Sequence, residues 1–243
     1  CKMFVDARGI SSLIQKDRTG ILQSAQYEIY ADWIKKDRVN VYLDAEKFPG
    51  FFAWVIPSSY GRGKVGLAGR GINAAYTLNQ FLGTMSDHCI IRKIYAPIWI
   101  KGPIEKFVDG RVVTIGDAAG QAKPTTAGGI FSSGMGGIFA GRAISKFLSS
   151  GNRSDLEQYQ KNWKGMFGRE FTRQLLARKI LERLDNITIN KLCKSITPDM
   201  AKEISEKDDF DFHTSSVVRL LGASGTIQAI RAIAGAELQK ILR

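Results

Sequence analysis

The stretch "VVTIGDAAGQAKPTTAGGI", residues 112–130, decides the fold of this 243-residue chain. An apolar run ends abruptly at Gly116-Asp117, a turn of small residues follows, and two glycines open a long helical pattern. This order predicts a strand over 110–117, buried on both faces, and a helix over 128–148. The stretch therefore joins a strand, a tight turn and a helix start in direct succession.

A carboxylate at the end of a strand can accept hydrogen bonds from ligand hydroxyl groups, and Asp117 occupies that position. Gly116 lets the chain turn sharply and lets a ligand approach the backbone. The helix start presents unpaired N–H groups, which attract anionic or electron-rich groups. In the alternative interpretation, Asp117 caps a tight turn and the glycines serve packing, and the residues alone leave both open. The candidate ligand-contacting residues are Gly116, Asp117, Pro124, Gly128, Gly129 and Ile130.

The composition is that of an ordinary globular protein, with 44% hydrophobic and 24% charged residues. The net charge of +12 is compatible with a nucleic acid, an anionic lipid surface or an acidic redox partner. No arginine-aromatic motif or block of like charges indicates nucleic-acid binding. Three sparse cysteines fit a reducing compartment, and with only two histidines no metal site is expected. No signal peptide is visible, so we expect a cytoplasmic location.

Four of the expected strands form two hairpins of an antiparallel sheet. Segments 26–34 and 38–44 flank "KKD", and segments 50–59 and 64–69 flank "YGRG". Such a sheet can bury one face and offer the other to a ligand. "GRGKVG" at 61–66 matches the GxGxxG dinucleotide pattern, but strand residues follow it, so a hairpin turn is the better interpretation. Further strands are expected at 3–6 and 90–100, and a helix at 72–85 with Asn73 as its cap.

Beyond Ser150 the chain is mostly helical. An aromatic residue recurs every four positions on the first of these helices, which favours packing of one helix face in a core. Residues 160–195 hold nine Lys/Arg against three Asp/Glu, and a basic amphipathic helix is typical of proteins that lie on an anionic membrane surface. The aromatic positions are Tyr159, Trp163, Phe167 and Phe171.

Near the C-terminus, Asp209, Asp211 and His213 have side chains of the kind that bind metals. A solvated turn before a helix is the better interpretation of these three residues.

The order strand, GDAAG, seven residues, GG and helix resembles the second flavin motif of the flavoprotein monooxygenase and reductase superfamily. Three further stretches resemble its geranylgeranyl reductase branch. "KPTTAGGI" is similar to the "KPTTGGGI" of that branch, and "FAWVIPSSYGRGKVGLAG" resembles its YxWxFP stretch with the following hairpin. "DFDFHTSSVVRLL" is similar to a "DFDFHxPSV" stretch of archaeal members. The chain is thus identified as similar to the geranylgeranyl reductase family over most of its length.

This resemblance implies an FAD-dependent reductase that saturates C=C bonds in geranylgeranyl chains of membrane lipids or their precursors. Asp117 would contact the ribityl chain, and Gly128, Gly129 and the Ile130 backbone would lie near the pyrimidine edge of the flavin ring. An apolar substrate tunnel would be lined by Phe52, Trp54 and Pro57. No residue is a convincing proton donor, and the electron donor, NADPH or a ferredoxin-like protein, stays open. A peripheral contact with the inner membrane face would suit a lipid substrate.

The resemblance implies an α+β fold, an incomplete p-hydroxybenzoate-hydroxylase-like fold with added C-terminal helices. We expect residues 1–24 to end the FAD-binding portion and 25–109 to form the antiparallel substrate domain. Residues 110–150 would be the FAD-binding strand-loop-helix, and 151–243 a helical region. The first flavin motif of the family, a GxGxxG after an N-terminal strand, does not occur in the chain. We therefore expect a C-terminal portion of a longer polypeptide, or a chain that needs a partner.

Three departures from the family pattern stand out. The tyrosine of YxWxFP is Phe52 and its phenylalanine is Ile56, so a hydroxyl is lost while the bulk remains. The family's "ADG" reads "ARG" at residues 7–9, which makes Arg8 a candidate phosphate contact. Ala127 replaces a glycine of "KPTTGGGI".

Two other functions fit parts of the sequence. A monooxygenase or hydroxylase of the same superfamily would share the GDA motif, although the Trp-Pro stretch and "KPTTAGGI" favour the reductases. A basic module that binds membranes or nucleic acids without catalysis would account for the net charge of +12 alone.

Overall fold

The computed structural model describes residues 1–14, 17–207 and 211–212. The chain divides into two compact units, each with its own hydrophobic core. Helices combine with both parallel and antiparallel strands, which confirms the α+β class. Unit 1 comprises residues 1–21, 99–179 and 197–243, and unit 2 comprises residues 22–98 and 180–196.

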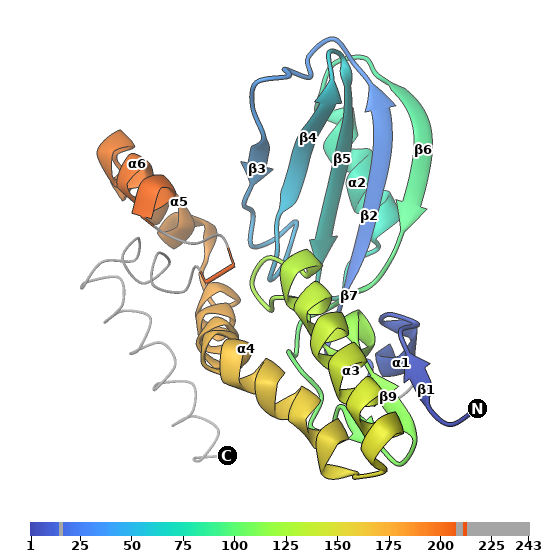
Figure 1. The fold of residues 1–243 in the computed structure, drawn as a ribbon. Helices are drawn as coiled ribbons and strands as arrows, with labels where there is room; N and C mark the ends of the chain where they lie inside the picture. Colours follow the sequence, from blue (N-terminus) through green and yellow to red (C-terminus); the bar gives the residue numbers. More distant parts are fainter. Residues whose placement is uncertain (15–16, 208–210, 213–243) are drawn as a thin grey trace, which may run out of the picture. The chain divides into compact units, whose positions relative to one another are not determined.

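Unit 2 is an antiparallel sheet with one face covered by a helix. This part of the chain contains β2 (Ile21–Tyr30), β3 (Asn40–Tyr42), β4 (Ala53–Ser59), β5 (Arg62–Gly69), α2 (Ala74–Gly83), β6 (Cys89–Tyr95), β7 (Ile98–Trp99) and α5 (Asn186–Ser195). The strand order is β3-β4-β5-β2-β6, and α2 lies across one face (Figure 1). Tyr27, Ile29, Val65 and Leu67 alternate with outward residues and are buried under α2, as in a half-covered sheet.

The pairing of β2 differs from the hairpin expected between residues 26–34 and 38–44, and that prediction is wrong. β2 pairs with β5 and β6, whereas β3 pairs with β4. The register sets Tyr27 opposite Val65, which aligns the buried faces of the two longest strands. Ile34, in the segment after β2, is buried in the core instead of continuing a strand. Burial therefore selected the partner strand over proximity in sequence.

Two local predictions in unit 2 are confirmed. Gly61 has φ +68° in the turn between β4 and β5, so the GxGxxG match is a hairpin turn followed by a strand. α2 begins after Asn73, whose side-chain oxygen accepts a hydrogen bond of 3.1 Å from the Tyr76 N–H. Both features depend on residues a few positions apart, which is why the sequence reveals them.

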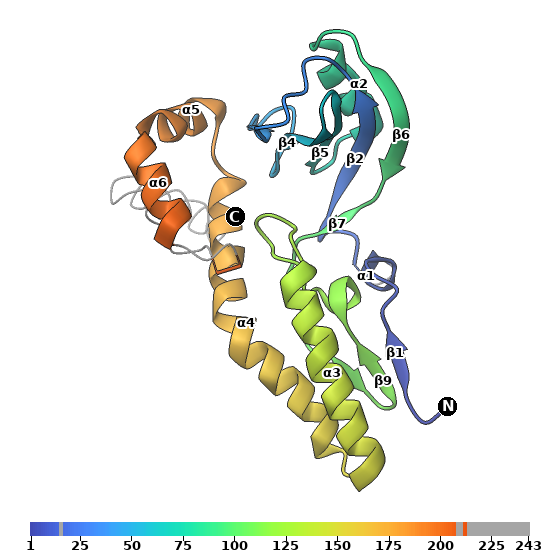
Figure 2. The ribbon, with the colours of Figure 1, turned by 45° about the horizontal axis from the view of Figure 1, so that its top comes forward.

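Unit 1 sets long helices beside a small sheet. It contains β1 (Phe4–Asp6), α1 (Ser11–Ile14), β8 (Val108–Asp109), β9 (Val112–Thr114), a 3₁₀ turn η1 (Gly116–Ala119), α3 (Ile130–Ser150), most of α4 (Ser154–Leu181) and α6 (Pro198–Lys207). β1 runs parallel to β9, β8 is antiparallel to it, and α3 lies beside β9 (Figure 2). Within β9 Val113 is buried while Val112 is 38% exposed, so the expected burial of this strand on both faces is wrong.

The aromatic stripe of α4 forms the core of unit 1, as predicted. Tyr159, Trp163, Phe167 and Phe171 are at most 1% exposed, and their rings lie in edge-on or tilted contacts of 5.0–6.3 Å. The Trp163 indole N–H donates a 2.9 Å hydrogen bond to the Ser132 carbonyl on α3. The stripe therefore joins α4 to the helix that follows the GDAAG turn.

Candidate functional site

A buried glutamine holds the GDAAG turn from beneath. The Gly116 N–H donates to the Gln121 side-chain oxygen at 2.8 Å, and the Gln121 amide donates to the Tyr159 hydroxyl at 2.9 Å. That hydroxyl donates in turn to the Thr114 carbonyl at 2.8 Å. Burial raises the pKa of Tyr159, which keeps its proton available for this bond. The turn is thus fixed by a chain of buried and partly buried hydrogen bonds.

Glycines in this turn are required by backbone shape and by close contacts. Gly116 has φ +65° and Gly120 has φ +67°, conformations that glycine adopts without a steric penalty. A methyl group on Gly120 would strike the Gly102 carbonyl oxygen. On α3, a methyl group on Gly136 would strike the Gln121 side-chain oxygen. These approaches hold the turn against the segment at Gly102 and against α3.

The Asp117 carboxylate lies beside the start of α3. Its Oδ1 atom would be 3.4 Å from a Cβ built on Gly129, the residue that precedes the helix. No described residue gives the Asp117 carboxylate a hydrogen bond or an ion pair. Desolvation by the surrounding turn raises its pKa. Gly129 makes no side-chain cap, and Ile130 at the helix start is 95% exposed.

The loop between the turn and α3 is closed by its own backbone. The Lys123 N–H donates to the Gly128 carbonyl, and the Ala127 N–H donates to the Lys123 carbonyl, both at 2.9 Å. The Pro124 carbonyl accepts a 2.8 Å bond from Arg178 of α4. Ala127 has φ +59°, so the position where the family pattern has glycine keeps the left-handed backbone that suits glycine.

Sequence reasoning missed the charged contacts beneath this loop. The Lys123 side chain is 2% exposed, and its ammonium lies 2.9 Å from an Asp211 carboxylate oxygen. Asp211 lies in a turn, as expected, but its partly exposed carboxylate is an ion-pair partner rather than a solvated group, whereas Asp209 and His213 lie outside the described residues. A lysine among small residues was the one visible signal, and its partner is 88 positions away.

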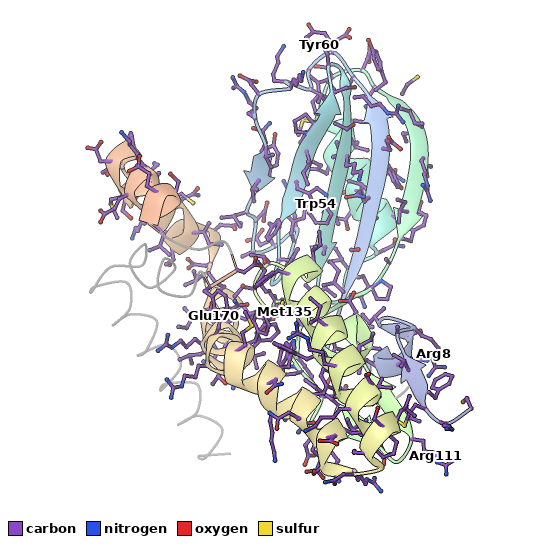
Figure 3. The ribbon with its side chains drawn as sticks, viewed as in Figure 1. Arg8, Trp54, Tyr60, Arg111, Met135 and Glu170 are labelled. Atoms are coloured by element: carbon purple, nitrogen blue, oxygen red, sulfur yellow. The ribbon has the colours of Figure 1, made fainter. Side chains whose placement is uncertain are left out.

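A second polar contact joins the loop to α4. Thr125 donates to the side-chain oxygen of Gln174 at 3.3 Å, and the Gln174 amide donates to Glu170 at 2.9 Å. Gln174 is fully buried and Glu170 is 8% exposed. Figure 3 labels Glu170 on α4. α4 therefore supports the loop as well as the core.

The candidate substrate residues lie on the sheet of unit 2. Trp54 and Phe52 fall on the face opposite α2, with ring centroids 6.0 Å apart, and Figure 3 shows Trp54 on β4. The Trp54 indole N–H donates a 3.1 Å hydrogen bond to the Gln26 side-chain oxygen. The indole covers Gly66, where an added Cβ would be 2.5 Å from the ring. By strand alternation Pro57 falls on the other face.

The structure thus gathers the predicted cofactor residues into one turn and helix start of unit 1. The predicted substrate residues belong to unit 2, where two of the three share a face. Arg8, suggested as a phosphate contact, pairs with Asp6 at 3.0 Å, and this pairing lowers the pKa of Asp6. Within the described residues, no cluster of His, Cys, Asp and Glu could hold a metal ion. None of the helices described is long and apolar enough to span a membrane.

Solved structures share this fold. A geranylgeranyl bacteriochlorophyll reductase-like protein from Thermoplasma acidophilum superposes with a TM-score of 0.80 at 19% identity, over 97% of this chain and 62% of that one. A flavin-dependent brominase variant superposes with a TM-score of 0.62 at 13% identity, over 97% and 62%. The chain therefore has the fold class found in flavin-dependent enzymes, with the GDAAG turn at the start of its α3 helix.

Sequence relatives define the family more closely. An uncharacterised protein of Methanocaldococcus jannaschii is 31% identical over 86% of this chain and 55% of its own length. Digeranylgeranylglycerophospholipid reductase 2 of Methanopyrus kandleri is 32% identical over 71% of this chain and 47% of its own length. No protein-family model matches the sequence. The chain belongs to the geranylgeranyl reductase family, and it spans about half the length of the curated relatives it matches.

Proposed function

We propose that this chain supplies the ribityl-and-ring half of an FAD site in a flavin-dependent reductase of geranylgeranyl lipids. The observation that carries the proposal is the Asp117 carboxylate, which no described residue pairs and which lies against Gly129 at the helix start. Partial desolvation raises the pKa of this carboxylate, but Asp117 is exposed to solvent, so hydroxyl groups of a ligand can reach its open acceptor atoms. Relatives named as digeranylgeranylglycerophospholipid reductases supply the substrate class.

The residues around Asp117 fit a flavin. Gly116 has room on its Cβ side, Gly128 and Gly129 pack against the loop itself, and the first N–H groups of α3 lack the intrahelical partners that later residues have. The Ser133 hydroxyl, near Gly116, is buried and has no hydrogen-bond partner among the described residues. We assign cofactor contact to Gly116, Asp117, Gly128, Gly129 and Ile130, while Pro124 stiffens the loop behind them.

The open face of the unit 2 sheet fits an apolar chain. Phe52 and Trp54 present flat surfaces there, and Gln26 fixes the indole through its hydrogen bond. Reduced flavin supplies a hydride, and these side chains orient the prenyl chain and exclude water. The donor of electrons to the flavin is NADPH or a ferredoxin-like protein.

The nucleotide half of the cofactor needs another polypeptide portion, in the same chain or in a partner. Parallel strands are normally covered on both faces. The parallel pair β1 and β9 instead leaves Phe4 52%, Val5 42% and Val112 38% exposed. Relatives about twice as long are consistent with an added portion that covers this sheet.

A peripheral membrane contact is also part of the proposal. α4 exposes Lys161, Arg169 and Arg173 together with Met166 and Leu176, which are 39% and 53% exposed. Basic and apolar side chains on one helix favour an anionic lipid surface. Sedimentation with vesicles containing anionic lipid should retain the protein at low salt and release it as salt rises.

Flavin content tests the cofactor assignment. In the form of the protein that carries the nucleotide-binding portion, purified material should be yellow and release FAD on denaturation. Asp117→Ala should weaken FAD binding at least about 10-fold, because charge-assisted hydrogen bonds to the ligand are lost. Asp109→Ala, which changes an exposed carboxylate on β8, is the matched control and should bind normally. A protein that stays colourless after FAD addition refutes the proposal.

Reaction chemistry separates the reductase from a hydroxylase of the same superfamily. Anaerobic incubation of reduced protein with a geranylgeranyl lipid should add two mass units for each double bond saturated. Oxygen consumption that depends on the lipid would identify a hydroxylase instead.

A further inference from the structure

We propose that the ion pair between Lys123 and Asp211 is a clamp that sets the conformation of the loop before α3, and that Lys123 positions this loop for the flavin ring. Only the second part of this proposal, the positioning of the loop for the flavin ring, rests on the proposed function. Asp211 and Phe212 belong to the "DFDFH" stretch at residues 209–213.

Lys123 is the central residue of the loop in both backbone and side chain. Its N–H and carbonyl close the loop through Gly128 and Ala127. Its Cε atom would lie 3.0 Å from a Cβ on Gly128, so the lysine stem runs directly under the helix start. A Cβ at position 128 would fit only if that stem shifted by a few tenths of an ångström. Any change in where the ammonium sits is therefore transmitted to the Gly128–Gly129 backbone.

The clamp is held from a distant part of the chain. Asp211 meets the Lys123 ammonium at 2.9 Å, with side chains that are 27% and 2% exposed. The next residue, Phe212, stacks on Phe167 of α4 with centroids 5.6 Å apart and planes 5° apart. A buried ammonium requires a carboxylate partner, and removal of one partner of a buried pair is more disruptive than removal of both.

An exposed ion pair of the same unit provides the contrast. Lys146 and Asp155 lie 2.8 Å apart, but the Lys146 side chain is 74% exposed. The Asp155 carboxylate is 9% exposed, but it also accepts a 2.6 Å hydrogen bond from Ser150, so loss of the exposed lysine should change little. It has the same chemistry as the Lys123 pair and does not touch the loop before α3.

Hydrogen exchange measures the clamp without flavin. In Asp211→Asn, the amide protons of Lys123 and Ala127 should exchange at least about 10-fold faster than in the unchanged chain, because their bonds close the loop. The double variant Lys123→Met/Asp211→Asn should exchange more slowly than Asp211→Asn, since no buried cation remains. Lys146→Met should leave both amides unchanged. If the two amides exchange at equal rates in Asp211→Asn and in the unchanged chain, the proposal that the ion pair sets the loop conformation is overturned.

The flavin spectrum measures positioning. In protein loaded with FAD, Lys123→Met should alter the visible circular dichroism of the flavin, and Asp211→Glu, which keeps the charge, should restore most of the signal lost in Asp211→Asn. An unaltered spectrum in Lys123→Met overturns the positioning role. If the unchanged protein binds no FAD, the proposed function fails, while the exchange experiment still decides the clamp.

Discussion

The loop around Asp117 in unit 1 and the sheet face around Trp54 in unit 2 both depend on a glycine in close contact, but the contacts differ. Gly120 in the loop lies against the carbonyl of Gly102, which is backbone. Gly66 in the sheet lies under the Trp54 indole, which is a side chain. Backbone in a packed turn cannot move without breaking hydrogen bonds, whereas an indole on an open face can rotate away. The loop should therefore tolerate less change than the sheet face.

Gly120→Ala should have the largest effect. The added methyl group meets the Gly102 carbonyl and lies 3.0 Å from the Pro103 Cα, and the backbone has φ +67°. We expect unit 1 to lose at least about 3 kcal/mol of unfolding free energy, measured by urea titration. Gly110→Ala is the control, because φ is +58° with open space around it, and about 1 kcal/mol is expected. Similar losses of unfolding free energy in both variants would show that the close contact at Gly120 does not set the cost.

Gly66→Ala should cost less, and the cost should depend on Trp54. A Cβ 2.5 Å from the indole forces the ring to move, with a loss of about 2 kcal/mol from unit 2. In a Trp54→Leu background the same substitution should cost clearly less, which a double-mutant cycle measures. Additive effects would show that the indole does not oppose the methyl group.

A change of pH acts on unit 1 through charge. Hydrogen bonds from Arg8 and Ser12 hold the pKa of Asp6 well below its usual range. The stability that this carboxylate contributes is therefore present at neutral pH and declines as pH falls below the unfolded-state value of about 4. In Asp6→Asn, the melting temperature should fall less between pH 6 and pH 3 than in the unchanged chain. Parallel pH curves would contradict this contribution.

Ala127→Gly should have the smallest effect and the opposite sign. Relief of the left-handed backbone at φ +59° stabilises the loop, while the added freedom of the unfolded chain offsets part of the gain. We expect a gain of up to about 1 kcal/mol. Ala75→Gly in α2 of unit 2 should instead lose about 1 kcal/mol, because glycine disfavours helices. Thermal unfolding of both variants compares them directly.

Predictions that rest on neighbours in sequence were reliable. The Asn73 cap and the turn at Gly61 were visible as short patterns, and the helix predicted from Gly128 begins two residues later, at Ile130. The aromatic stripe of α4 was visible too, because helical periodicity places its members on one face.

Predictions that needed a distant partner were not. β2 was expected to pair with the next strand in sequence, yet it pairs with β5 and β6, and the burial of its core face decided that choice. No residue near Lys123 in the sequence indicates that it pairs with Asp211. Likewise, no residue near Gly116 indicates that Gln121 donates a hydrogen bond to the Tyr159 hydroxyl.

The sequence by itself determined where this chain turns, where its helices start and which short stretch resembles a flavin motif. Those features follow from backbone conformations and periodicities that a few adjacent residues dictate. Only the tertiary structure decided that the Asp117 carboxylate is left without a partner among the described residues, while the buried Lys123 ammonium has one. Pairing of charges depends on which groups folding brings together, and that information is spread along the whole chain.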